Sequence, residues 1–395
     1  MPFDSLVLKK IEVARSDMAG RLRGLHDIVR GRHPAVHRIA LVLYEPANDL
    51  LRTFASSSDD HQGLVHYEAH LAAVPSLREL AASHIPRVID NLDLSLQAPS
   101  IHSIWLKARD YKSSYTVPVY SGQHLSAFLF FDSRLAQVFT PAVTTDLDVI
   151  ADIVAQLYLL RIAAVNTLVG AVDVAKGLAR LRDVETGAHL ERMASYSRLI
   201  AQTLAPRLGL SDEFVEYLHL FAPLHDIGKV GIPDRILLKP GRLDDTERAC
   251  MQQHVVIGEK LVRNIISDLG IENDLAASVM VNLVAHHHER GDGSGYPQGL
   301  LLEQIPMEAR IVAVADVYDA ISSHRPYKAA WSEAECVAEL RRESALNRLD
   351  PVCVEALIEA EGERMRIRHQ LSDDSHAEGE PSLPPTGVVT SADAA

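Results

Sequence analysis

The stretch from Glu216 to Asp234, EYLHLFAPLHDIGKVGIPD, places two ionisable residues, His225 and Asp226, at the end of a very apolar run. Burying such a pair is costly unless something compensates its charge, and a divalent cation does so. Gly228 lets the backbone turn, and Lys229 can reach back to whatever the pair binds. The stretch therefore predicts an all-α domain with a metal site at the edge of a buried helix.

Other histidines and carboxylates repeat this pattern along the C-terminal half. Glu185 and His189 are four residues apart at the start of a predicted helix, so their side chains share one face. An isolated histidine on an apolar helix is usually a hydrogen-bonded core residue, but here five predicted helices each contribute a histidine or an aspartate. The further candidates are His254, His286, His287, Asp316 and Asp319.

The residue types narrow the choice of metal. Imidazoles and carboxylates without a thiolate suit Fe, Mn or Zn in an open catalytic site rather than a closed structural zinc site. For His219, His288 and His324, the surface or core interpretation is preferred, because neighbouring residues already supply a ligand. The sequence thus predicts a catalytic metal centre of nitrogen and oxygen ligands.

Composition excludes several classes of protein. The chain has 395 residues with 39 basic and 53 acidic side chains, so its net charge is 39 − 53 = −14. Such a chain is a poor candidate for binding duplex nucleic acid. The three cysteines form no CxxC pair, which argues against a disulfide scaffold or an iron–sulfur cluster. No leader segment and no run of 18 apolar residues is found, so we expect a soluble, cytoplasmic protein without a membrane contact.

The chain divides into four predicted regions. Residues 1–140 alternate strand-like and helical runs, which indicates an α+β domain; residues 141–181 form a connecting helix. Residues 182–370 are helical with no convincing strand, and the Ser-, Pro- and acid-rich tail at 371–395 is expected to be disordered. The helices expected in the third region lie at about 186–206, 211–226, 244–268, 272–288, 306–322, 332–345 and 350–366.

The connecting segment carries an apolar stripe from Val143 to Leu178, with apolar residues at spacings of three and four. A single protomer is expected to leave such a stripe partly exposed, which favours a parallel homodimer through this helix. The alternative is two separate helices, each packed on its own domain, which Gly170 and Gly177 keep open.

The N-terminal region resembles a GAF domain at its end. The residues that carry the resemblance are the hairpin at 113–134, SSYTVPVYSGQHLSAFLFFDSR, and the exit helix at 139–161, FTPAVTTDLDVIADIVAQLYLLR. Pro118 suggests that its strand lies at an edge or carries a bulge. GAF domains are small-molecule or dimerisation sensors, so the resemblance implies an input role. A structural dimer module without a ligand is the alternative.

Four segments resemble the HD-GYP domain, a subgroup of the HD metal-dependent phosphohydrolases. They are ETGAHLERM at 185–193, HDIGKVGIPDRIL at 225–237, HHHERGDGSGYPQGL at 286–300 and ADVYDAISSHRPYK at 315–328. The resemblance covers roughly residues 165–365. It implies an all-α phosphodiesterase that hydrolyses cyclic di-GMP to pGpG, GMP or both, with two or three divalent ions, commonly iron or manganese.

The resemblance also implies a set of site residues. The implied metal ligands are Glu185, His189, His225, Asp226, His254, His286, His287 and Asp316. Among the three consecutive histidines, the spacing to Glu289 favours His286 and His287. Asp226 is the expected bridging carboxylate, and a metal-bridged hydroxide is expected to attack phosphorus while Lys229 stabilises the phosphate charge. Tyr296, Arg325 and Lys328 are expected to hold the dinucleotide.

The leading prediction is therefore a cyclic di-GMP phosphodiesterase whose N-terminal sensor regulates it through the connecting helix. Two alternatives remain open. One is an HD-type phosphohydrolase of another nucleotide. The other is a receptor that binds cyclic di-GMP without hydrolysing it.

Overall fold

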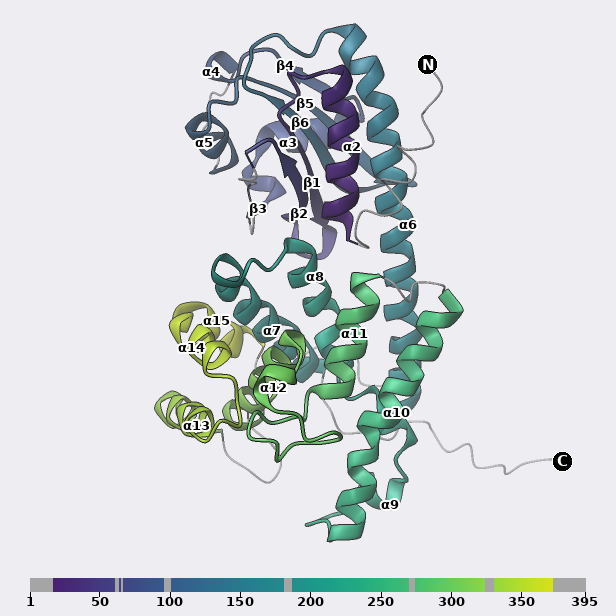
Figure 1. The fold of residues 1–395 in the computed structure, drawn as a ribbon, viewed down its shortest axis with the longest axis vertical. Coiled ribbons are helices and arrows are strands. Elements are labelled where there is room, and N and C mark those ends of the chain that lie inside the picture. The colour runs from purple at the N-terminus through teal and green to yellow at the C-terminus, as the bar shows by residue number, and fades with distance from the viewer. Residues whose placement is uncertain are drawn as a thin grey trace, which may run out of the picture.

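The structure is a computed structural model, and it describes residues 17–60, 64, 67–95, 101–180, 187–269, 274–323 and 330–371. Predictions that concern Glu185, Arg325, Lys328 and the tail beyond residue 371 lie outside these ranges. Figure 1 shows an N-terminal domain built on a sheet, a long helix beside it, and a helical domain at the other end.

The N-terminal domain contains a six-stranded antiparallel sheet with the strand order β3-β2-β1-β6-β5-β4. The strands are β1 (Arg38–Glu45), β2 (Leu50–Ser58), β3 (Glu68–His70), β4 (Arg87–Ile89), β5 (Ser113–Ser121) and β6 (His124–Ser133). The predicted hairpin is confirmed as β5 and β6, joined at Gly122, whose φ of +60° suits glycine. The ladder shifts register between Val119 and Tyr120, directly after Pro118, so the predicted irregularity is present.

Both faces of this sheet are covered. Alternate residues of its central strands point to opposite faces, and each set packs against a helix. On one face, Ile39 and Leu41 pack with Leu22 of α2 (Met18–Arg32). On the other, Val42 and Phe128 pack with residues of α3 (Pro75–Ser83). Two short helices, α4 (Leu92–Ser95) and α5 (Ile101–Ala108), precede β5. The predicted α+β class is therefore confirmed for this region.

The long helix α6 (Pro141–Arg180) is one continuous element of 40 residues and runs along both domains (Figure 1). In the described part of its apolar stripe, Leu160 is 69% exposed, as predicted, whereas other members are covered by the same chain. Leu147 and Val154 are fully buried, and Ile150 is nearly so, because α6 packs against α2, β5 and the helical domain of the same chain. The exposed apolar residues of α6 lie on its other side.

The C-terminal region is helical, as predicted. Its helices are α7 (Gly187–Leu208), α8 (Asp212–Phe221), α9 (Asp234–Leu237), α10 (Asp245–Leu269), α11 (Leu275–His286), α12 (Met307–Ser322), α13 (Glu333–Ala345), α14 (Pro351–Glu359) and α15 (Glu361–Gln370). The helix expected at 211–226 ends instead at Phe221 and continues as 3-10 turns, because Pro223 cannot supply the next helical N–H. The helix expected at 350–366 divides at Ala360. No helix in the described ranges is both long and apolar enough to cross a bilayer.

Among the described residues, polar contacts on the surface and in the interior join the domains. On the surface, Glu68 of β3 accepts hydrogen bonds from Arg198 and Gln202 of α7. In the interior, Arg161 of α6 pairs with Glu213 of α8 at 2.8 Å and with Asp274 at the start of α11. Glu213 also accepts a hydrogen bond from the Met18 backbone N–H of α2 at 2.7 Å. The second contact therefore ties α2, α6, α8 and α11 together.

Glu213 should make the stability of this junction depend on pH. Burial raises the pKa of Glu213 to about 7, although the Arg161 guanidinium opposes the shift. Because the folded-state pKa lies above the unfolded value, the neutral form stabilises the fold fully below about pH 4.5, and this contribution is lost as pH rises through 7. Through Glu213, the free energy of unfolding can change by at most about 1.4 kcal/mol per pH unit. Glu213→Gln should remove this pH dependence.

The measurement is urea unfolding of metal-free wild type and Glu213→Gln at intervals from pH 5 to pH 8. The free energy of unfolding of the wild type should fall relative to that of the variant as pH rises. A difference that stays constant over this range would contradict the raised pKa.

Candidate metal centre

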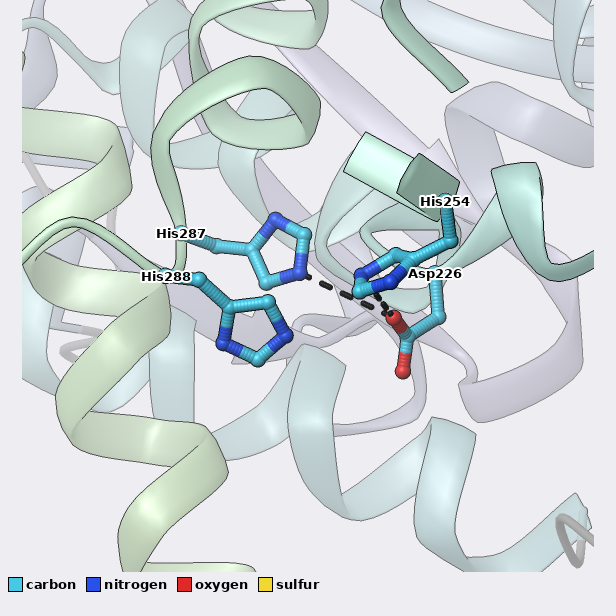
Figure 2. A group of neighbouring side chains, drawn as sticks. All are labelled: Asp226, His254, His287 and His288. Atoms are coloured by element: carbon cyan, nitrogen blue, oxygen red, sulfur yellow. Dashed lines mark ion pairs between the residues drawn. The ribbon is translucent and has the colours of Figure 1, made fainter. Parts of the chain in front are cut away.

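Asp226 lies at the centre of the first group of candidate ligands. Its Oδ1 is 3.0 Å from Nε2 of His254 and 3.7 Å from Nε2 of His287. Figure 2 shows these two imidazoles converging on one oxygen of the carboxylate, with His288 beside them. The ligand atoms of Asp226, His254, His287 and His288 all lie within 4.8 Å of one another.

A close approach between two backbones positions this carboxylate. A Cβ atom on Gly228 would lie 1.8 Å from the His254 carbonyl oxygen and 2.5 Å from the Gly258 nitrogen. Only glycine lets the turn after Asp226 press against α10 at this point. The prediction that Gly228 serves the turn is thus refined, because the residue is needed for contact with α10, which brings His254 to Asp226.

A second group lies next to the first. It comprises His189 of α7, His225 and Asp316 of α12, whose ligand atoms also lie within 4.8 Å of one another. Oδ2 of Asp226 is 3.2 Å from Nε2 of His225, whereas its Oδ1 faces His254 and His287. The two carboxylate oxygens of Asp226 therefore face the two groups.

Backbone carbonyls fix the tautomer of three of these histidines. Nδ1 of His225 donates to the Ala222 carbonyl at 2.9 Å, and Nδ1 of His254 donates to Met251 at 2.8 Å. Nδ1 of His287 lies 3.1 Å from the Leu283 carbonyl. Because a carbonyl only accepts, the proton is on Nδ1 and the Nε2 lone pair faces Asp226.

The charges of the site agree with ligation. Burial lowers the pKa of His287 and of His288, so both imidazoles are neutral near neutral pH. Burial alone would raise the pKa of Asp226, but the charge that His225 carries when it is protonated in the metal-free site, together with that of Lys229, outweighs burial and holds that pKa well below its usual range. Neutral imidazole and ionised carboxylate are the forms that bind metal.

The buried polar atoms of the first group also fit a cation. Asp226 Oδ1, His254 Nε2 and His287 Nε2 are buried without a hydrogen bond of acceptable geometry. Buried polar atoms are normally satisfied, and unsatisfied ones that converge on one point call for an ion or a water. A divalent cation satisfies two imidazole lone pairs and a carboxylate together, so these residues fit the metal that the sequence predicts.

The structure corrects the choice among the three consecutive histidines. It brings His287 and His288 to Asp226, but His286 belongs to neither group in the described part of the chain. The His286 imidazole instead interacts electrostatically with the charged side chains of Glu259 and Arg263 of α10. Helical periodicity could have shown this, because His287 follows the buried Leu283 by four residues, whereas His286 follows the half-buried Asn282.

Two candidate substrate residues lie at the site. Nζ of Lys229 is 2.8 Å from Oδ2 of Asp226. The Tyr296 ring lies 4.8 Å from that of His288, and burial followed by the charges of Asp226 and Asp316 raises the pKa of its hydroxyl. Both residues are thus close to both groups. The candidates Glu185, Arg325 and Lys328 are outside the described residues.

Glu289 has a role that the sequence does not reveal. Its carboxylate accepts hydrogen bonds from the backbone N–H groups of Gln298 at 2.7 Å and Leu300 at 2.9 Å. It therefore closes the loop that carries Tyr296, rather than joining either ligand group. The only indication in the sequence was the position of Glu289 between the three histidines and the glycine-rich loop.

A search of protein families finds that residues 181–353 match the HD domain family. Several curated relatives match the same half of the chain. The chain is 44% identical over 198 residues to "Cyclic di-GMP phosphodiesterase response regulator RpfG" of Xanthomonas campestris pv. campestris, covering 50% of this chain and 49% of that one. It is 41% identical over 211 residues to "Cyclic di-GMP phosphodiesterase" of Thermotoga maritima, covering 53% and 54%.

A third relative carries a different substrate in its name. It is "3'3'-cGAMP-specific phosphodiesterase 2" of Vibrio cholerae, 40% identical over 192 residues, covering 49% of this chain and 34% of that one. The chain thus spans about half the length, or less, of these relatives. The match of residues 181–353 to the HD domain agrees with the sequence motifs of the C-terminal half.

The solved structures that match lie over a smaller part of the chain. The chromophore-binding domain of a bacteriophytochrome from R. palustris aligns with 40% of this chain and 61% of its own, at a TM-score of 0.32 and 14% identity. A phycoerythrobilin-bound GAF domain from a cyanobacterial phytochrome aligns with 38% and 89%, at a TM-score of 0.31 and 15% identity.

The reassignment of the histidines can be tested with a matched pair of variants. His288→Ala should weaken Mn²⁺ binding at least about tenfold, since it removes a ligand of the first group. His286→Ala, one residue away, should bind Mn²⁺ like the wild type. Titration calorimetry on metal-free protein measures both, and stronger loss in His286→Ala than in His288→Ala would reverse the assignment.

Proposed function

We propose that this chain is a metal-dependent phosphodiesterase that hydrolyses cyclic di-GMP to pGpG, GMP or both. The observation that carries the proposal is the pair of ligand groups joined by the two oxygens of Asp226. Such a pair can hold two ions that share one carboxylate, the arrangement used for displacement at phosphorus. The names of the relatives, which match over the same residues, favour a cyclic dinucleotide as the substrate.

The residues have separate proposed roles. His189, His225 and Asp316 would hold one ion, and His254, His287 and His288 the other, with Asp226 between them. Glu185 remains a proposed further ligand, and Fe or Mn the proposed metals. When bound, the ions supply Lewis acidity and a water of lowered pKa for attack on the phosphodiester.

The remaining chemistry belongs to side chains that face the substrate. Lys229 would donate from its ammonium group to the reacting phosphate and stabilise the charge that builds there. Tyr296 would contact the nucleotide beside His288. Arg325 and Lys328 remain proposed to hold the second phosphate, because the acidic chain needs local positive charge for a doubly anionic ligand.

Two alternatives are distinguished by one assay. Metal-loaded protein is mixed with cyclic di-GMP or with 3'3'-cGAMP, and the products are separated by chromatography. Faster turnover of 3'3'-cGAMP would favour the specificity that the name of the Vibrio cholerae relative states. Binding of cyclic di-GMP without any product would favour the receptor.

Asp226→Ala should reduce hydrolysis to below about one-thousandth of the wild-type rate, because both ligand groups lose their shared carboxylate. Helical content by circular dichroism should remain, since the side chain lies among candidate metal ligands rather than in the apolar core. The control is Asp245→Ala, an exposed carboxylate at the start of α10. Near-normal turnover in Asp226→Ala with Mn²⁺ supplied would refute the shared-metal proposal.

We also propose that the N-terminal domain is a GAF-like sensor that regulates the helical domain. The supporting contacts are physical. Glu68 at the sheet edge binds Arg198 of α7, the helix that also carries His189. A shift of the sheet edge can therefore act on a helix that bears a metal ligand. Three further points stay predictions. They are the ligand of this domain, the division of the chain into four regions, and the cytoplasmic location.

The homodimer stays a proposal as well, but its contact face changes. Val149, Ile153 and Leu160 are exposed on α6, at 54%, 38% and 69%. With the exposed Gln156 and Ala163 they repeat at spacings of four and three, the pattern of a coiled-coil seam. A second copy of α6 would cover this face, opposite to the stripe that packs inside the chain.

Light scattering at micromolar concentration should give about twice the chain mass of 43.4 kDa. The double variant Val149→Asp, Leu160→Asp should give the mass of one chain, because it places charges in the apolar seam. Val352→Asp, an exposed valine on α14, is the matched control and should leave the mass unchanged. A dimer that survives the double variant would place the interface elsewhere, and a monomeric wild type would remove it.

A further inference from the structure

Asp319 of α12 is one of the most deeply buried carboxylates of the helical domain, with 1% of its surface exposed. Its Oδ2 lies 2.7 Å from Nδ1 of His189, and its Oδ1 accepts a hydrogen bond from Nε of Arg192. It is not a member of either ligand group in the described residues. The carboxylate thus contacts a candidate ligand, His189, at Nδ1.

We propose that Asp319 is a positioning residue, which holds His189 so that Nε2 faces the metal shared with His225 and Asp316. This inference rests on the proposed metal centre. A carboxylate only accepts in its ionised form, so the His189 proton sits on Nδ1 and the lone pair is left on Nε2. A carboxylate behind a ligand histidine fixes the ring and raises its basicity.

His189 differs from the other histidines of the site in the acceptor that its Nδ1 contacts. His225, His254 and His287 donate from Nδ1 to carbonyls three or four residues earlier. His189 is the third residue of α7, which begins at Gly187. Asp319, from another helix, lies at hydrogen-bond distance from Nδ1 of His189.

Asp319 is itself held in place. Arg192 donates to both of its oxygens, through Nε and through Nη2 at 3.3 Å, and the Ser323 hydroxyl donates at 3.2 Å. Arg192 is 3% exposed and also donates to the Leu371 carbonyl at 2.8 Å. Because the guanidinium compensates the buried carboxylate, Asp319 needs no protonated imidazole as its partner.

The spacing on α12 joins two roles. Asp316 and Asp319 are three residues apart, so they share one face of the helix. Asp316 contributes a ligand, and Asp319 orients a ligand that comes from α7. The relative placement of α7 and α12 therefore decides whether this ion has two correctly aligned partners.

The test compares Mn²⁺ binding of Asp319→Asn with that of the wild type, by titration calorimetry and electron paramagnetic resonance. In the wild type, two ions that share a carboxylate should give a spin-coupled spectrum. In the variant, one ion should bind 10- to 100-fold more weakly. With Mn²⁺ added at one equivalent more than the protein, the spectrum should change from the spin-coupled form to that of isolated Mn²⁺. The ion at His254, His287 and His288 should be retained.

The matched control is Asp350→Asn, a buried aspartate that pairs with Arg310 at 3.2 Å but contacts no candidate ligand. It should bind two ions like the wild type. Two ions bound with unchanged affinity in Asp319→Asn would overturn the proposal. Equal loss of both ions, with a fall in metal-free Tm larger than that of Asp350→Asn, would also overturn it, because the role would then be structural.

If Asp319→Asn does not fold, Arg192→Lys decides the question. This variant keeps the positive charge but loses the paired contacts to Asp319, so selective weakening of one ion supports the proposal and unchanged binding of two ions overturns it. A wild type that binds no Mn²⁺ would overturn the metal centre together with this role. A wild type that binds two ions but leaves cyclic di-GMP intact would overturn the proposed function alone.

Discussion

The contact between the turn at Gly228 and helix α10 is the constraint on which the site depends. It brings the His254 backbone so close that no side chain fits between them, and it sets Asp226 against the imidazoles of α10 and of the end of α11. The cost of burying the carboxylate is offset only by groups that favour its charge. Lys229 is such a group, and a divalent cation between the carboxylate and the imidazole lone pairs would be another, so the local fold and the proposed chemistry support each other.

The rest of the helical domain can be understood as support for this arrangement. The candidate ligands come from α7, α10, α12 and the segments after α8 and α11, and four of the histidines are oriented by a second contact at Nδ1. Three histidines use carbonyls of their own turns, whereas His189 uses Asp319. Glu289 plays the same part for the loop of Tyr296. Positions held this way lose little conformational freedom when a metal binds, which strengthens binding.

The two domains share elements rather than meeting at a simple linker. α6 packs its apolar stripe on both, and the buried contact of Arg161 and Glu213 joins it to α2 and α8. A movement in the sheet domain would therefore have to deform packed or ion-paired elements, and these include α7. This gives the proposed regulation a route through contacts, without a requirement for a flexible joint.

The sequence by itself determined the helical class of the C-terminal half, the hairpin of the sheet domain and most ligand types, because helical period, turn residues and clustered histidines are local patterns. Only the tertiary structure decided which members of those patterns meet. It grouped His288 rather than His286 with Asp226, buried Leu147, Ile150 and Val154 of the α6 stripe within the same chain, and placed Asp319 beside His189 from a helix 130 residues away in sequence. The physical reason is that metal ligation and burial depend on the directions of side chains from different helices, and those directions follow from how the helices pack.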